Sequence, residues 1–199
     1  MNLLMIQIDC FDISRLNAQD YTALYQRASR ERRERADRYL RQEDRLRCLC
    51  AEAMLRKALG REDYRLEYGE NGKPYLTDGE GVHFNLSHSG RWVVIAYGAT
   101  PVGVDVQELR ANGLEVIARR FFTDDERTYA QRDAESFFRI WTGKESYIKY
   151  LGAGLKTPLN SFSVLEDLGV NLFTERLDNA CLTLCTQENG YTVTKLEKL

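Results

Sequence analysis

Valine alternates with glycine and polar residues between positions 102 and 107, a pattern with a period of two residues. Such alternation predicts a β-strand whose valines share one face. The opposite face presents the carboxylate of Asp105 and the amide of Gln107 next to each other. The predicted strand therefore has one apolar side suited to a core and one polar side suited to a ligand.

A second segment, residues 141–149, has a helical period instead. Trp141, Glu145 and Lys149 recur every four residues, so they lie roughly along one side of a predicted helix. Facing the strand, this helix would add a carboxylate and lysines to the polar side. Magnesium is usually held by one or two carboxylates, while water and phosphate oxygens complete its shell. The two segments together predict a nest for a hard cation and phosphates.

The remaining pattern gives a strand, helices and strands, followed by a second series of a similar kind. Predicted strands cover residues 2–9, 83–86, 92–97, 161–165, 169–175, 181–186 and 191–196, and predicted helices fall within 17–59, 114–122 and 134–150. Gly60 ends a helix, and a capping box from Thr123 to Glu126 begins another. This order predicts an α+β fold of two similar halves, residues 1–100 and 101–199.

The composition is that of a globular protein. The chain has 199 residues, of which 43% are apolar, enough for a real core. A net charge of -2 does not indicate nucleic acid or a membrane surface. Residues 1–10 lack the basic start of a signal peptide, and no apolar run approaches the ~18–20 residues that span a bilayer. The five cysteines, an odd number without a C-x-x-C pair, are interpreted as reduced thiols of a cytosolic protein.

The segment 30–47 is strongly basic and predicted to be helical. Glu31 with Arg35, and Glu43 with Arg47, are four residues apart, so one interpretation is a solvated helix laced by pairs worth ~0.2–0.5 kcal/mol each. A second interpretation is a phosphate-binding face, because arginine offers a planar fork suited to phosphate. A nucleic-acid arm is the third, although aromatic residues are sparse there and the whole chain is acidic.

Two further segments have both an ordinary and a functional interpretation. Gly72-Lys73-Pro74 is either an exposed turn or a turn in which proline fixes the backbone and aims Lys73 at a ligand. Residues 87–91 (Ser-His-Ser-Gly-Arg) are predicted to form a hairpin-like loop that could hold a phosphate or an adenine edge. No G-x-S-x-G elbow surrounds His88, which argues against a serine-nucleophile triad. The joint appearance of these segments in one chain favours a functional site.

The ordered motifs resemble those of the 4'-phosphopantetheinyl transferases of the surfactin-synthetase-activating type. The matching stretches are 38–47 (RYLRQEDRLR), Gly72-Lys73-Pro74, 83–92 (HFNLSHSGRW), 101–107, Arg120-Phe121-Phe122, 141–149 and 158–164. The resemblance implies a pseudodimer of two α/β subdomains in one chain, with coenzyme A and the active site in the cleft between them. That implication agrees with the two halves predicted from the order of elements.

The family reaction moves 4'-phosphopantetheine from coenzyme A to a serine hydroxyl of an apo acyl or peptidyl carrier protein and releases 3',5'-ADP. Phosphoryl chemistry of this kind needs positioning and charge neutralisation more than covalent help. The resemblance therefore implies a cytoplasmic enzyme that uses Mg²⁺, has coenzyme A as substrate and a carrier protein as partner. It is expected to act as a monomer, without nucleic acid or membrane.

The resemblance also implies roles for individual side chains. Asp105 and Glu145 match metal ligands, and Gln107 stands where many members have a third carboxylate, so it offers an oxygen without a charge. Glu145 is also the candidate base for the serine hydroxyl, and Lys149 matches the lysine that stabilises the transferring phosphate. The implied coenzyme A contacts are Arg32, Arg35, Arg47, Lys73, Ser87, His88 and Lys144, with Arg47 and His88 towards the 3'-phosphate.

Two alternatives from other functional classes stay open at this point. A catalytically weak relative would bind coenzyme A or a carrier protein without transfer. Gln107 favours that alternative, whereas the intact Asp105, Glu145 and Lys149 oppose it. A nucleic-acid binder that uses the basic helix would show steep salt dependence, and retention on a coenzyme A resin with magnesium would oppose it.

Overall fold

A computed structural model describes residues 5–78 and 81–199. Up to residue 100 the chain forms β1 (Ile6–Asp12), η1 (Ile13–Arg15), α1 (Ala18–Arg27), α2 (Arg30–Asp37), α3 (Gln42–Leu59), β2 (Leu66–Tyr68), β3 (Pro74–Leu76), β4 (His83–Ser89) and β5 (Trp92–Gly98). It then forms β6 (Val102–Glu108), α4 (Leu114–Phe121), α5 (Asp124–Ala130), α6 (Ala134–Leu151), η2 (Gly154–Lys156), η3 (Leu159–Ser161), β7 (Asn171–Leu177), β8 (Ala180–Thr186) and β9 (Tyr191–Lys195). The predicted α+β class is confirmed.

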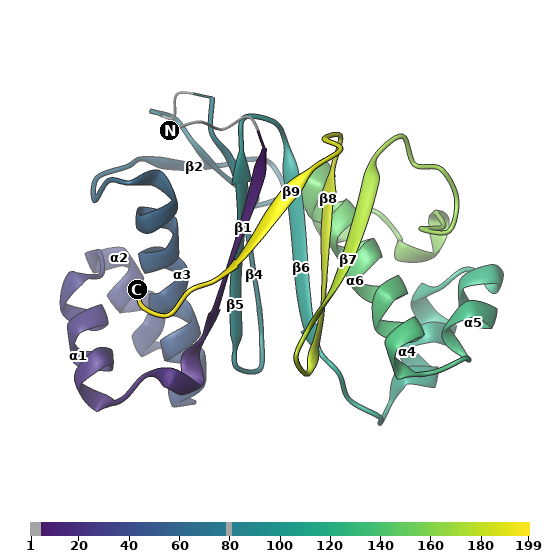
Figure 1. Cartoon of the computed structure of the whole chain (residues 1–199), viewed down its shortest axis with the longest axis horizontal. Helices are drawn as coiled ribbons and strands as arrows, with labels where there is room; N and C mark the ends of the chain where they lie inside the picture. The colour runs from purple at the N-terminus through teal and green to yellow at the C-terminus, as the bar shows by residue number, and fades with distance from the viewer. Residues whose placement is uncertain (1–4, 79–80) are drawn as a thin grey trace.

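Two sheets stack face to face at the centre of the molecule, and helices cover their outer sides (Figure 1). One sheet has the strand order β4-β5-β1-β9 and the other β6-β8-β7. The valines of β6 pack between the sheets with Ile8 of β1 and Leu184 of β8. On the outer side of the first sheet, Met54 of α3 packs against Phe84 and Ile95. The polar residues of β6 therefore face away from the central core, towards α6, which contacts β6 and β8.

Local sequence sets where the helices begin and end. Gly60 ends α3 in the left-handed conformation, as predicted. Thr123 and Glu126 form the predicted capping box of α5. The Asp133 carboxylate accepts a hydrogen bond from the backbone amide of Ser136 at 2.7 Å and so caps the start of α6. None of the helices in the described parts of the chain is long and apolar enough to cross a bilayer.

The long helix α6 approaches β6 closely because the strand has a glycine at the crossing point. A Cβ atom on Gly103 would lie 2.1 Å from the carbonyl oxygen of Ser146 and 2.4 Å from the amide nitrogen of Tyr150. Both distances are far below van der Waals contact, so only glycine permits this approach. The close packing brings Lys149 to within hydrogen-bond distance of Asp105.

The structure corrects some predicted strands. β1 runs to Asp12, and the start of the predicted strand at 2–9 lies outside the described residues. No strand forms at 161–165, because Phe162 packs against Tyr147 and the short helix η3 occupies the start of the segment. The short hairpin β2–β3 is a further addition to the predicted elements.

The predicted loop at 87–91 is largely strand. Ser87 to Ser89 continue β4, and only Gly90 and Arg91 make the turn to β5. Small polar residues are typical of loops, which explains the error. Here the hydroxyls of Ser87 and Ser89 accept hydrogen bonds from backbone amides of β6, and the strand is stable with them.

The strand predicted at 191–196 is confirmed as β9, and it joins the first sheet. β9 pairs in parallel with β1, with Ile6 opposite Tyr191 and Cys10 opposite Lys195. The chain therefore returns to its first sheet after building the second (Figure 1). The division into residues 1–100 and 101–199 stays a prediction.

Candidate active site

Asp105 lies at the centre of the polar face of β6 and is 5% exposed. Its Oδ1 accepts a hydrogen bond from Lys149 Nζ at 2.6 Å and another from Ser87 Oγ at 2.7 Å. Its Oδ2 is buried and has no hydrogen-bond partner among the described residues. Because an unpartnered buried carboxylate oxygen is costly, this atom is an open ligand position.

Asp105, Gln107 and Glu145 line one cavity of about 220 Å³ between β6 and α6. The rest of its lining comes from Arg110, Ile117, Phe137, Phe138 and Trp141. Burial raises the pKa of the Glu145 carboxyl, the charge of Asp105 raises it further, and Lys149 opposes the shift. The three predicted metal ligands therefore meet in one place.

This donor set fits a hard cation. It offers two carboxylates and an amide oxygen, and Asp105 Oδ2 is free to coordinate. No cluster of three or more His, Cys, Asp or Glu side chains suited to a metal occurs among the described residues. Here the third group, Gln107, is an amide and would bring no charge. Arg110 is a cavity residue that the sequence analysis does not predict. The one sequence feature that points to it is its position three residues after Gln107.

Ser87 and His88 point to different sides of β4, because neighbours in a strand alternate. Ser87 is buried and contacts Asp105 and Lys149, whose Nζ donates to its hydroxyl at 2.9 Å. His88 lies on the side of Arg47 and is exposed. Desolvation by the surrounding protein nevertheless lowers its pKa, and the positive charges of Arg47 and Lys149 lower it further.

Arg47 lies beside the turn between β4 and β5. Its guanidinium forms an ion pair with Asp44 and donates to the carbonyl oxygen of Gly90. The pKa of Asp44 is lowered, first by its hydrogen bond with Arg47. The predicted neighbours Arg47 and His88 are thus brought together at one end of β4.

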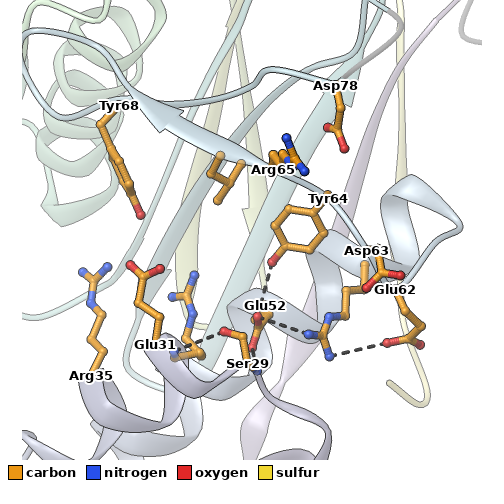
Figure 2. Close-up of a pocket in the computed structure, with 13 residues that line it drawn as sticks. Ser29, Glu31, Arg35, Glu52, Glu62, Asp63, Tyr64, Arg65, Tyr68 and Asp78 are labelled. Atoms are coloured by element: carbon orange, nitrogen blue, oxygen red, sulfur yellow. Dashed lines mark hydrogen bonds and ion pairs between the residues drawn. The ribbon is translucent and has the colours of Figure 1, made fainter.

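Arg32 and Arg35 lie on α2 and line a different cavity, of about 450 Å³. Figure 2 shows Arg35 and Glu31 at one end of it, near Tyr68, with Glu52 further along. Arg32 donates to Cys48 Sγ at 3.9 Å. The walls carry arginines and carboxylates together, so the cavity has no single charge. The structure does not bring Arg32 and Arg35 into the cavity of Asp105.

Lys73 reaches from the β2–β3 hairpin to the elements of the site. Its Nζ donates to the carbonyl oxygens of Val102 at 3.1 Å and Tyr150 at 3.0 Å. Beside it, Asn71 Nδ2 donates to the carbonyl oxygen of Gly152 at 3.0 Å. Burial lowers the pKa of Lys73 to about 8. The hairpin therefore lies against the start of β6 and the end of α6.

Lys144 is placed differently from the other predicted contacts. It is fully buried, and its Nζ lies 2.7 Å from Glu126 Oε2, which is also fully buried. The same Nζ donates to the carbonyl oxygens of Leu159 at 2.7 Å and Phe162 at 2.5 Å. These three partners use all three ammonium protons. Lys144 is therefore buried with no free ammonium proton in this arrangement, and its predicted contact with coenzyme A stays a prediction.

Comparison with known proteins places this chain in a family. A family model described as the 4'-phosphopantetheinyl transferase superfamily matches residues 101–194, and one described as the N-terminal part of 4'-phosphopantetheinyl transferase matches residues 16–100. A 4'-phosphopantetheinyl transferase of Bacillus subtilis is 37% identical over 77% of this chain and 74% of its own length. The transferase Sfp of Bacillus subtilis strain 168 is 39% identical over 68% of this chain and 65% of its own. The transferase ffp of Bacillus subtilis is 36% identical over 75% and 71%.

These matches cover both series of elements and reach well beyond the short motifs. The chain belongs to the 4'-phosphopantetheinyl transferase family. It is accordingly an enzyme that transfers a 4'-phosphopantetheine group, and the resemblance inferred from the motifs is confirmed.

Proposed function

We propose that the cavity between β6 and α6 is where this enzyme transfers 4'-phosphopantetheine from coenzyme A to a serine of an apo acyl or peptidyl carrier protein. The serine oxygen forms a bond to the phosphorus that carries pantetheine. The bond from that phosphorus to the bridging oxygen breaks, and 3',5'-ADP leaves. The observation that carries this proposal is the buried, unpartnered Oδ2 of Asp105 beside Glu145 in one cavity.

Asp105, Glu145 and Gln107 would hold Mg²⁺, with Gln107 contributing a neutral oxygen. When bound, the cation would offset the negative charge of the pyrophosphate. Lys149 already supplies one positive charge next to Asp105. It is proposed to stabilise the charge that builds up on the transferring phosphate. Fixed positive groups of this kind act without reorganising during the reaction.

Glu145 is the proposed base for the serine hydroxyl, directly or through one water molecule. A carboxyl whose pKa is raised by burial is a better proton acceptor than an ordinary one. The serine proton would therefore pass to Glu145 as the new bond to phosphorus forms. No covalent intermediate with the enzyme is needed.

The phosphates of coenzyme A would be bound by residues of the first half. Arg47 and His88 are proposed to bind the 3'-phosphate, because they lie together at the turn after β4. Arg32, Arg35 and Lys73 would contribute further positive charge. Ser87 of β4 contacts Asp105 and Lys149, so it would connect the residues proposed to bind coenzyme A with those proposed to bind the metal.

Residues 1–100 would then serve mainly coenzyme A and residues 101–199 the metal and the chemistry. The enzyme is proposed to act as a monomer. The five cysteines are free thiols, which supports a reducing compartment such as the cytoplasm.

The test is mass spectrometry of apo acyl and peptidyl carrier proteins after incubation with coenzyme A and Mg²⁺. We expect the wild type to add one phosphopantetheine to the serine, and EDTA to abolish the addition. Asp105→Ala and Glu145→Gln should each lower turnover about 100-fold or more, as when a stabiliser of transition-state charge is lost. Near-wild-type modification by either variant would contradict the site. Binding of coenzyme A without any transfer by the wild type would instead identify a catalytically weak relative.

A further inference from the structure

The edges of the two sheets meet where β4 runs beside β6, and side chains join them. The amides of β6 donate to side-chain oxygens of β4 in three successive bonds: Val104 to Asn85 Oδ1 at 2.9 Å, Val106 to Ser87 Oγ at 3.2 Å and Glu108 to Ser89 Oγ at 3.0 Å. The acceptors are every second residue of one strand, and the donors are every second residue of the other. We name this set of bonds the seam.

The seam brackets the proposed metal ligands. Asp105 lies between the first two bonded amides of β6, and Gln107 lies between the second and the third. In a strand, fixing the residues on both sides of a position fixes where its side chain points. The seam therefore sets the placement of Asp105 and Gln107 relative to β4.

Asn85 accepts one of the three hydrogen bonds of the seam and has no other part in the site. It is 6% exposed, and its Oδ1 is the acceptor for the amide of Val104, one residue before Asp105. A buried amide that loses its acceptor is costly to leave unpaired, so β6 would shift to find another partner. Ser89 fixes the opposite end of the seam through the amide of Glu108.

We propose that Asn85 and Ser89 are positioning residues that hold β6 against β4 and so hold Asp105 and Gln107 in the geometry that binds the divalent cation. This inference rests on the proposed function of the Asp105 cavity. Neither residue touches the substrate or the cation in this role. Both act through the backbone of β6. A purely structural role would lower stability without changing the affinity for the cation.

The experiment measures Mn²⁺ binding by electron paramagnetic resonance in the presence of 3',5'-ADP, using the full chain. Asn85→Leu removes the acceptor, whereas Asn85→Asp keeps an acceptor oxygen in the same place. We expect Asn85→Leu to weaken Mn²⁺ binding by about tenfold, the lower end of the range for losing a group that orients a metal ligand, because Asn85 acts on Asp105 only through the backbone of Val104. Asn85→Asp should restore binding to nearly that of the wild type.

The matched control is Ser163→Ala, which removes a buried hydroxyl that donates to Asp125 at 2.8 Å, away from the seam. It should lower stability and leave Mn²⁺ affinity unchanged. Amide hydrogen exchange gives an independent reading, because the Val104 amide should exchange faster in Asn85→Leu and stay protected in Asn85→Asp.

If Asn85→Leu folds and binds Mn²⁺ like the wild type, the inference is wrong. If it does not fold, Ser89→Ala provides the decision: weaker Mn²⁺ binding with the chain still folded supports the inference, and unchanged binding overturns it. Failure of the proposed function would look different, because the wild type itself would then lack affinity for Mn²⁺ or fail to modify a carrier protein.

Discussion

Two lysines on α6 form short ion pairs, yet their surroundings differ. Lys144 Nζ lies 2.7 Å from Glu126 with both side chains fully buried, and Lys149 Nζ lies 2.6 Å from Asp105 with the lysine 28% exposed. Lys144 gives its remaining protons to two backbone carbonyls. In the second pair, Asp105 keeps a free oxygen that faces no protein donor in the described chain.

We call the pair of Lys144 and Glu126 the structural pair and, following the proposed function, the pair of Lys149 and Asp105 the functional pair. Lys144 and Glu126 satisfy each other and their neighbours, so the pair has no capacity for a ligand. Asp105 is only half satisfied, so its pair with Lys149 keeps one acceptor oxygen for a cation. Lys149 Nζ itself has three acceptors, on Asp105, Ser87 and Val104, just as Lys144 has. The distance between the two charges does not distinguish these cases, because it is nearly the same in both. The unused Oδ2 of Asp105 does.

The largest effect is expected from breaking the structural pair. Lys144→Met would leave Glu126 buried without a counter-charge, which should lower the free energy of unfolding by about 3–5 kcal/mol. Urea denaturation followed by circular dichroism measures this. Adding Glu126→Gln, which removes the buried charge and keeps an acceptor, should recover part of the loss. Unchanged stability together with lost coenzyme A binding would show that Lys144 is a substrate contact after all.

Breaking the functional pair should give the opposite pattern. Lys149→Met removes the charge proposed to stabilise the transferring phosphate, so kcat should fall about 100-fold, or more. The loss of unfolding free energy should be smaller than for Lys144→Met, because Asp105 keeps its bond from Ser87. Steady-state kinetics and the same urea denaturation check both values. A variant that unfolds readily while its kcat is preserved would reverse the assignment of the two pairs.

Substitutions of Gln107 test how strongly the cavity beside the functional pair binds Mg²⁺. Gln107→Glu should stay active and need less Mg²⁺ for half-maximal rate, because the added carboxylate would face the cavity beside Asp105. Gln107→Ala should cost about tenfold or less if the amide only orients a water molecule. Magnesium titration of both variants measures this. A loss as large as that of Asp105→Ala would show that the amide is a direct and necessary ligand.

The smallest effect is expected for Lys73, a third lysine to set beside Lys144 and Lys149. Its Nζ donates hydrogen bonds to two backbone carbonyl oxygens and not to a carboxylate. Its pKa is lowered by burial to about 8, so it is protonated below that pH and loses its charge above it. If it binds coenzyme A phosphates, affinity should be full below pH 8 and fall roughly fivefold over the next pH unit. Calorimetry with 3',5'-ADP measures this. Lys73→Arg is the control and should show a flat profile, and a flat wild-type profile would contradict the role.

The helical period alone predicts that the two lysines lie in different surroundings. Positions 144 and 149 are five residues apart, so their side chains point roughly 140° apart on a helix. Glu145 and Lys149 share a side, which is why the sequence predicts their meeting with the polar face of β6. The partners of Lys144 could not be predicted, because they come from α5, from η3 and from Phe162 just after η3, whose approach depends on tertiary packing.

β4, the strand that contains Ser87, shows a second case in which the sequence alone is not sufficient. Its small polar residues carry the local signal of a loop, and the signal that overrides it comes from β6, a different strand of a different sheet. Likewise, the alternation that predicts β9 does not identify β1 as its partner. Local patterns therefore predict which way side chains point within an element, while contacts between elements need the fold.

The pairing of β9 with β1 has a consequence for how the molecule is made. Ile6 is placed opposite Tyr191, so the sheet that packs on α3 needs a strand that the ribosome produces after all the others described here. Pairings between such distant positions form slowly. Until β9 arrives, β1 has an open edge that other nascent chains can extend. A chain that stalls before β9 would therefore be a substrate for chaperones and proteases, even though every residue that lines the cavity of Asp105 had already been synthesised.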